Sequence, residues 1–88
     1  MIFMFYVYYL RSKLFPEKTY IGFTSNLKQR LSEHDAGKSV YTKRYKPCHL
    51  IGFMAFDQEL KAIKFERYLK TNAGRIFLKR WDESIGRK

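Results

Sequence analysis

The sequence predicts an α+β fold: a small three-stranded antiparallel sheet flanked by helices, in the order β-β-α-β-α-α. Short apolar runs rich in aromatic and β-branched residues, which are typical of strands, alternate with stretches whose apolar residues recur at helical spacing. A length of 88 residues leaves room for one core. We therefore expect a single domain over residues 1–88, with its core at about 3–81 and a charged C-terminal tail.

The first part of the chain predicts a β-hairpin. Phe3–Leu10 is an apolar run that suits a buried strand, and Thr19–Phe23 suits a second one. Between them, Arg11–Lys18 contains Pro16 and is expected to be the connecting loop. Gly22, inside the second run, indicates a close approach to the backbone of that strand.

A helix is expected after the hairpin. Asn26, with Gln29 three residues further on, resembles a capping box that begins a helix. The helix is expected to run to about Asp35, and Gly37 to end it. The following segment, Lys38–Pro47, is predicted to be a basic loop.

The second half of the chain predicts one more strand and two more helices. His49–Phe56 is the expected third strand. Asp57 is the expected N-cap of an amphipathic helix over Gln58–Thr71. Asn72–Gly74 is expected to break this helix, and Arg75–Trp81 to form a short third one.

The charge of the chain points to a polyanionic partner. Eighteen Lys and Arg oppose eight Asp and Glu, a formal net charge of +10. Nucleic acid is the usual partner of such a protein, and charge that serves only solubility is the alternative. The basic residues run through the folded part of the chain rather than gathering in a tail, which favours nucleic acid.

Other features of the composition favour a cytoplasmic protein that does not bind membranes. The single cysteine, Cys48, cannot form an intramolecular disulfide or, by itself, a cysteine zinc site. Met1–Leu10 is apolar but too short to span a bilayer as a helix, and no basic segment or small-residue cleavage site flanks it.

Glu66 lies in an unusual place for a carboxylate. At helical spacing it falls on the apolar arc of its predicted helix, between Ala62 and Ile63. An ionised carboxylate is costly there unless a cation or several donors meet it. A structural ion pair with Arg or Lys is one explanation, and a ligand or catalytic role is the other.

Four other side chains are candidates for the same site. Arg30 and His34 flank the apolar side of the first predicted helix, and Tyr8 and Tyr20 lie on the two strands of the hairpin. Each has a structural alternative: an Arg stem can cover apolar surface, a helix-terminal His can be a cap, and tyrosines are common in sheets.

Taken together, these residues fall into motifs with a known order. The chain resembles the GIY-YIG nuclease domain in its small stand-alone form, from about Phe5 to Trp81. The motifs are Tyr6-Val7-Tyr8, Tyr20-Ile21-Gly22, Asn26-Leu27 followed by Arg30-Leu31 and His34, and Phe65-Glu66-Arg67 ahead of Leu69-Lys70.

The resemblance implies a three-stranded antiparallel sheet flanked by helices and hydrolysis of phosphodiester bonds with one divalent ion, Mg²⁺ or Mn²⁺. Tyr8 and Tyr20 match the tyrosines of the two motifs, and Arg30 matches the catalytic arginine. Glu66 matches the metal-binding glutamate, and His34 a position near the active site. The residues alone do not choose which tyrosine is the general base.

The sequence also departs from the family pattern. Tyr6 stands where the first motif has glycine in its name, and Phe23 stands where some members carry a lysine. Lys43 is a candidate substitute for that lysine.

We therefore expect a metal-dependent endonuclease that acts on DNA, with selectivity for DNA structure and a role in repair or recombination. RNA stays open as a substrate, as does a protein partner that supplies specificity. The alternative is a nucleic-acid-binding module with little or no cleavage. The residues expected to contact nucleic acid are Lys38, Lys43, Arg44, Lys46 and Arg75.

Overall fold

The computed structural model describes residues 3–86, without the side chains of residues 41 and 83–86. It confirms the predicted α+β fold and the three-stranded antiparallel sheet. The elements, in chain order, are β1 (Phe5–Ser12), β2 (Thr19–Thr24), α1 (Leu27–Asp35), α2 (Val40–Tyr45), β3 (Cys48–Phe56), α3 (Glu59–Leu69) and α4 (Asn72–Gly86).

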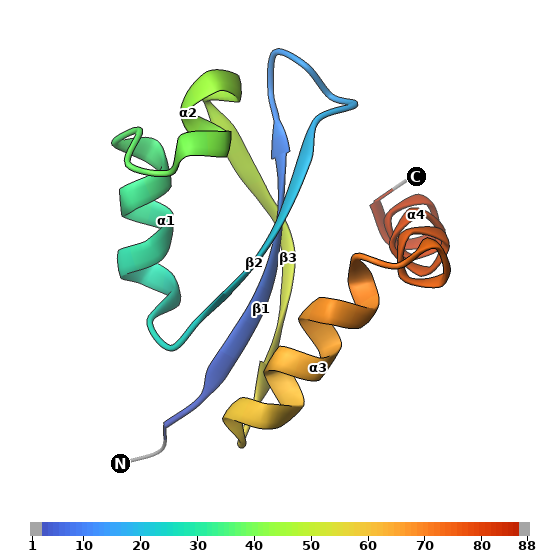
Figure 1. Ribbon diagram of the computed structural model, residues 1–88. Helices are drawn as coiled ribbons and strands as arrows, with labels where there is room; N and C mark the ends of the chain where they lie inside the picture. The colour runs from blue at the N-terminus through green and yellow to red at the C-terminus, as the bar shows by residue number, and fades with distance from the viewer. Residues whose placement is uncertain (1–2, 87–88) are drawn as a thin grey trace.

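The sheet has β1 at its centre, in the order β2-β1-β3. Both neighbours pair with β1 in antiparallel register, which places Tyr8 opposite Gly22 on one side and Phe53 on the other. Helices α1 and α2 lie on one side of the sheet, and α3 and α4 lie on the other (Figure 1). The two faces of the sheet therefore have different coverings and, as described below, different chemistry.

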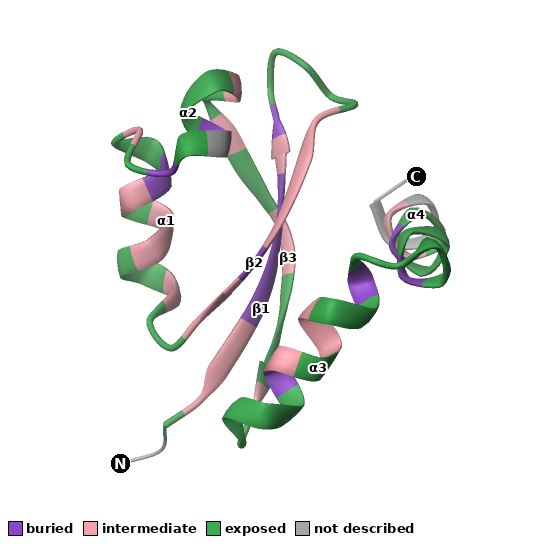
Figure 2. Ribbon diagram, in the orientation of Figure 1, coloured by how far each residue is buried: buried purple, intermediate pink, exposed green. Residues whose placement is uncertain are grey.

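The hydrophobic core lies on the α3–α4 face. Val7 and Tyr9 of β1 pack there against Ala62 and Leu69 of α3 and Leu78 of α4. Side chains alternate along a strand, so Tyr8, between these two residues, projects to the α1–α2 face. Figure 2 shows the middle of β1 buried, whereas the edge strand β3 is largely exposed.

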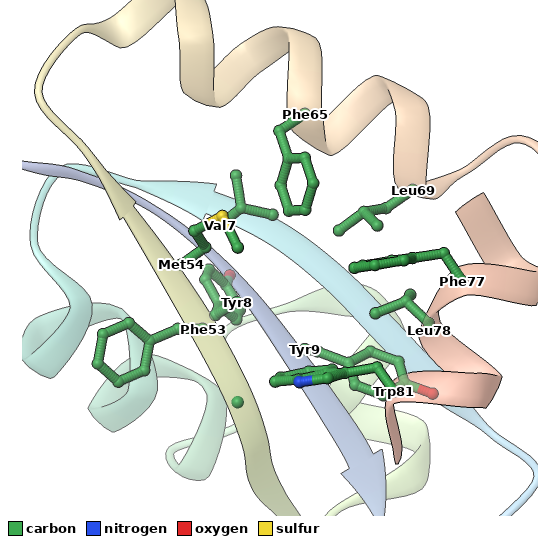
Figure 3. A pocket seen from close by; sticks show the side chains of 11 residues that line it. Val7, Tyr8, Tyr9, Phe53, Met54, Phe65, Leu69, Phe77, Leu78 and Trp81 are labelled. Carbon is green, nitrogen blue, oxygen red and sulfur yellow. The ribbon is translucent and has the colours of Figure 1, made fainter. Parts of the chain in front are cut away.

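A small apolar pocket remains within this core (Figure 3). Its volume is about 80 Å³. Phe65 from α3 and Phe77 and Trp81 from α4 line it together with β1 and β3. The six-membered ring of Trp81 lies so close to Gly52 that a Cβ there would stand 2.2 Å from it. The interior of the α3–α4 face is thus built for packing, and the predicted residues Tyr8, Arg30 and His34 meet on the other face.

Three local predictions were wrong, although the predicted order of the main elements is confirmed. The segment predicted as a basic loop, Lys38–Pro47, contains the short helix α2. The N-cap of α3 is Gln58, while Asp57 accepts a hydrogen bond from Lys61 instead. The spacing of apolar residues cannot locate a helix as short as α2, because so short a helix is not stable alone and depends on tertiary contacts.

The junction between α3 and α4 is also tighter than predicted. Asn72–Gly74 does not separate the helices, because α4 already begins at Asn72. A Cβ on Gly74 would stand 2.0 Å from the carbonyl oxygen of Tyr68. Glycine at this position therefore lets α4 begin directly against the end of α3. None of the described helices is long and apolar enough to cross a membrane.

Candidate active site

A chain of buried polar side chains lies on the α1–α2 face of the sheet. The Tyr8 hydroxyl is 2.8 Å from Nε2 of His34, and Nε of Arg30 donates a hydrogen bond to the same hydroxyl at 3.3 Å. On the far side of the imidazole, Nδ1 of His34 is 2.6 Å from Oγ1 of Thr42. Tyr8 and His34 are only 1% and 3% exposed. Strand β1 and helices α1 and α2 thus meet in one hydrogen-bonded cluster.

Helix α1 delivers two of these residues because of how it begins. Its N-cap is Asn26, whose side-chain oxygen accepts a hydrogen bond from the Gln29 backbone at 3.1 Å, as the capping motif predicts. From that start, Arg30 and His34 are one turn apart and face the sheet. Leu27 and Leu31, the two leucines of this helix, are only half-buried.

Gly22 is what allows Tyr8 to lie in this cluster. A Cβ at position 22 would stand 2.3 Å from both the ζ carbon and the hydroxyl oxygen of Tyr8. The two residues are register partners on β1 and β2. The glycine predicted from the sequence to mark a close approach therefore makes room for the phenol ring of the first motif.

Gly22→Ala should displace the Tyr8 ring and destabilise the fold by about 1–3 kcal/mol, as overpacking of a tight site commonly does. We expect cleavage to be lost even where the variant is still folded. Gly52→Ala is the matched control, because its added methyl meets Trp81 on the opposite face. Melting temperature and nicking should be measured on both. Equal nicking by two variants of similar stability would contradict this role of Gly22.

Tyr20 connects the buried cluster to an open groove. Its ring centroid is 5.1 Å from that of His34 and 6.1 Å from that of Tyr8. The residue is half-buried rather than buried. It also lines a groove at the β2 edge of the sheet together with Lys70 and Arg75. Of the two tyrosines, Tyr20 is therefore the one that a substrate in the groove would meet.

Glu66 is half-buried on α3, and its carboxylate accepts a hydrogen bond from Lys70 at 3.1 Å. Arg30 instead forms an ion pair with Glu33 of its own helix at 2.9 Å. Glu66 therefore has an ion pair with a lysine, as the structural explanation expected, and its partner is not Arg30. Glu66 does not join the Tyr8 cluster directly, but its partner Lys70 lines the same groove as Tyr20.

Burial sets the protonation of the cluster. It raises the pKa of Tyr8 to about 12, although the hydrogen bond from Arg30 acts in the opposite direction. Burial, with a further contribution from the Arg30 charge, lowers the pKa of His34. The pKa of Arg30 is raised, chiefly by Glu33 and then by Tyr8. At neutral pH the cluster thus holds a neutral phenol and a neutral imidazole beside a fixed guanidinium charge.

The residues expected to contact nucleic acid are all exposed. Four of them lie in and around α2, on the same side of the sheet as the cluster, and the fifth lines the groove with Tyr20. They are Lys38, Lys43, Arg44, Lys46 and Arg75. Phe23, where a lysine stands in some family members, packs against the core and stacks on Phe5.

Three partners in the site were missed by the reasoning from sequence. Glu33 and Lys70 stand three and four residues from Arg30 and Glu66, so the usual helix pairing rule could have found them. Thr42 gave no such signal, because its contact with His34 depends on the unpredicted helix α2.

The donor set around Glu66 fits a hydrated hard cation. In the described part of the chain, no three His, Cys, Asp or Glu side chains gather to enclose an ion. A half-buried carboxylate held only by an exposed lysine can exchange that partner for a metal ion. Mg²⁺ commonly binds through one or two carboxylates, waters and substrate phosphates rather than in a protein cage.

Comparison with known families agrees with this geometry. Residues 4–80 match the model of the GIY-YIG catalytic domain. The chain belongs to the GIY-YIG family. This membership marks it as a nuclease domain and supports an endonuclease activity. The resemblance identified from the sequence motifs is thereby confirmed.

The relatives of this GIY-YIG chain include small proteins of similar length. It is 33% identical to a UPF0213 protein of Staphylococcus haemolyticus over 79 residues, which are 89% of this chain and 94% of the relative. It is 36% identical to a UPF0213 protein of Natronomonas pharaonis over 67 residues, 75% of this chain and 76% of the relative.

A longer relative has a more specific name. The structure-specific endonuclease subunit SLX1 homolog of Giardia intestinalis is 38% identical over 55 residues, 58% of this chain but 15% of that protein. No solved structure matches the chain.

Proposed function

We propose that this GIY-YIG domain is a DNA endonuclease that hydrolyses phosphodiester bonds with one divalent ion, Mg²⁺ or Mn²⁺. The observation that carries the proposal is the convergence of half-buried Arg30 on buried Tyr8 and His34, with Tyr20 between this cluster and an open groove. Burying polar side chains costs free energy unless each one is hydrogen-bonded. A module that only binds nucleic acid would gain nothing from burying this set.

Arg30 is the proposed transition-state contact. Its guanidinium is held by Glu33 on one side and by the Tyr8 hydroxyl on the other, so its orientation is fixed before substrate arrives. A planar guanidinium can donate two hydrogen bonds to a phosphate that gains negative charge. Preorganised donors of this kind stabilise developing charge without reorientation during the reaction.

Tyr20 is the proposed general base. Tyr8 is only 1% exposed, and its hydroxyl already contacts both Arg30 and His34. Tyr20 is more accessible and faces the groove where a phosphodiester can bind. A tyrosine with an ordinary pKa of about 10 needs a nearby positive charge to accept a proton from water near neutral pH. Arg30, which donates a hydrogen bond to Tyr8 beside the Tyr20 ring, supplies such a charge.

Glu66 is the carboxylate that would hold the metal ion, with water molecules and the substrate phosphate as the other ligands. The ion, when bound, would act as a Lewis acid on the scissile phosphate and stabilise the leaving 3′ oxygen. Lys70, which now holds the Glu66 carboxylate, would then be free to contact phosphate in the groove that it lines.

The substrate we propose is DNA with a distinctive structure, such as a branch or flap, in repair or recombination. The support is indirect: one relative is named as a subunit of a structure-specific endonuclease. A partner protein that supplies specificity is part of the same proposal.

A nicking assay tests the proposal directly. Supercoiled plasmid and branched DNA should be cleaved in the presence of Mg²⁺ or Mn²⁺ and left intact with a chelator. Binding to the same DNA without cleavage under any metal condition would support the alternative, a nucleic-acid-binding module. The same assay on RNA decides between the two nucleic acids.

Binding to DNA should weaken steeply as salt rises, with log K falling linearly with log salt concentration, because each phosphate contact releases counterions. The variant Lys43→Gln/Arg44→Gln/Lys46→Gln should lower the slope by about 0.9 for each phosphate contact that is lost. Lys61→Gln/Lys64→Gln is the control, since both lysines are exposed on α3 across the sheet. A wild-type slope near zero, or equal slopes in the two variants, would argue against the α2 face as the DNA surface.

A further inference from the structure

Thr42 is a polar residue that is buried where packing alone would favour an apolar side chain. It is 1% exposed, on a six-residue helix whose apolar Val40 is 91% exposed. Packing driven by apolar burial would favour the reverse arrangement, because removing the valine side chain from water is the more favourable transfer. The turn of α2 therefore places the Thr42 hydroxyl, rather than an apolar group, inside the molecule, 2.6 Å from Nδ1 of His34.

The hydrogen bonds along the cluster have a consistent direction. Arg30 is always protonated, so its Nε–H donates to the Tyr8 oxygen, which acts as an acceptor there. The one proton of the Tyr8 hydroxyl is then best directed at Nε2 of His34, 2.8 Å away. A neutral imidazole whose Nε2 accepts must carry its proton on Nδ1, and that proton points at Oγ1 of Thr42.

We propose that Thr42 is a positioning residue that holds His34 in the Nδ1–H tautomer, so that Nε2 of His34 accepts the proton of Tyr8. The inference deepens the proposed endonuclease function and rests on it for its catalytic meaning. Its geometric basis is the buried chain Thr42–His34–Tyr8, which does not involve the metal ligand Glu66.

The proposal includes a proton path from Tyr20, whose ring centroid is 6.1 Å from that of Tyr8. The Tyr20 proton moves to the Tyr8 oxygen as the Tyr8 proton moves to Nε2 of His34. Tyr20 becomes a phenolate and His34 an imidazolium, while Tyr8 is unchanged. The Tyr20 phenolate then takes a proton from the attacking water, whose oxygen bonds to phosphorus as the bond from phosphorus to the 3′ oxygen breaks. The 3′ oxygen leaves and takes up a proton from solvent, and His34 releases its extra proton to solvent, which restores the cluster. Thr42 contributes by accepting the Nδ1–H hydrogen bond, which strengthens as the imidazole gains charge.

The pH dependence follows from the groups that face His34. The rings of Tyr8 and Tyr20 on the sheet lie against the imidazole, and the charges of Arg30, Glu33 and Asp35 on α1 act on it. Burial and Arg30 lower the pKa of His34, so the neutral, proton-accepting form persists as the pH falls. Activity should decline only when the pH falls through that lowered pKa. Without the Thr42 hydroxyl the imidazolium loses an acceptor, and the pKa should fall further.

The test compares Thr42→Val, which keeps the shape and removes the hydroxyl, with Thr42→Ser, which keeps the hydroxyl. Nitrogen-15 NMR of the imidazoles in the full chain reports the tautomer of His34, and exposed His49 gives the reference signals. Wild type and Thr42→Ser should show Nδ1–H. Thr42→Val should lose the Nδ1–H preference and show a lower His34 pKa. Its kcat for nicking should fall roughly 10-fold or more, with KM unchanged, and Thr42→Ser should retain most activity.

The readouts separate this inference from the proposed function. If the wild type does not cut any nucleic acid, the nuclease proposal fails, while the NMR tautomer still decides the role of Thr42. A wild-type His34 with its proton on Nε2 overturns the inference whatever the activity. So does a folded Thr42→Val variant with an unchanged tautomer and pH profile. A Thr42→Val variant that only melts earlier, with normal kcat, marks Thr42 as a purely structural residue and also overturns it.

Discussion

Replacing Glu66 with glutamine should abolish DNA cleavage at ordinary Mg²⁺ or Mn²⁺ concentrations while leaving DNA binding intact or tighter. The substitution keeps the size of the side chain but removes the charge that would hold the ion. Binding should not suffer, because a negative charge leaves a surface that faces phosphate. Metal-dependent nicking and an equilibrium DNA-binding assay on the same preparation measure the two effects.

The stability of Glu66→Gln should be close to that of the wild type. The ion pair with Lys70 is a partly exposed helical pair, with side chains 22% and 56% exposed. Such pairs contribute only about 0.2–0.5 kcal/mol. Glu59→Gln, at the exposed start of the same helix, makes the same change of net charge and should cut normally. A Glu66→Gln protein that melts much earlier yet still cuts DNA would contradict the assignment of Glu66 as the metal ligand.

Replacing Arg30 with alanine should lower kcat by about 10²-fold or more, similar to the loss of a donor to developing charge, with a smaller effect on binding. The variant also removes the hydrogen bond to Tyr8, so the pKa of that tyrosine should rise above its value of about 12. Arg30→Lys should be a poor replacement, because an ammonium group lacks the planar pair of donors. Single-turnover nicking and the DNA dissociation constant distinguish the two effects.

Two controls accompany Arg30→Ala. Arg67→Ala removes the same charge from an exposed position on α3 and should reduce kcat little. Glu33→Gln removes the partner of the Arg30 guanidinium but leaves its contact with Tyr8, so an intermediate loss is expected. Equal losses of affinity and rate in Arg30→Ala would instead indicate an ordinary phosphate contact.

The sheet and the long helices could be predicted from the sequence because their signals are local. The continuous apolar run of β1, the Asn26 cap of α1 and the periodicity of α3 each lie within about a dozen residues. Helix α2 and the start of α4 could not, since one depends on contacts with α1 and the other on the absence of a Cβ at Gly74.

The candidate site also has a part that could be predicted from the sequence and a part that could not. Tyr8, Tyr20, Arg30 and His34 could be named in advance, and the structure brings their side chains together. Glu33, the partner of Arg30 on the same helix, could also have been found, but partners on other elements could not. The hydroxyl of Thr42 reaches His34 from a different helix, and this contact is a property of the tertiary fold. The catalytic, metal-binding and nucleic-acid-binding roles of all these residues remain predictions.

The division of the molecule into two faces separates catalytic competence from thermal stability. The apolar core holds the sheet to α3 and α4, whereas His34 is the buried residue of α1. Detaching α1 breaks the hydrogen bonds of Arg30 and His34 while the α3–α4 core stays packed, so this local opening costs less free energy than global unfolding. A substitution that improves the α3–α4 core would therefore raise the melting temperature without holding Arg30 in place. The attachment of α1 to the sheet is thus a second equilibrium, separate from global unfolding, and a melting curve does not report it.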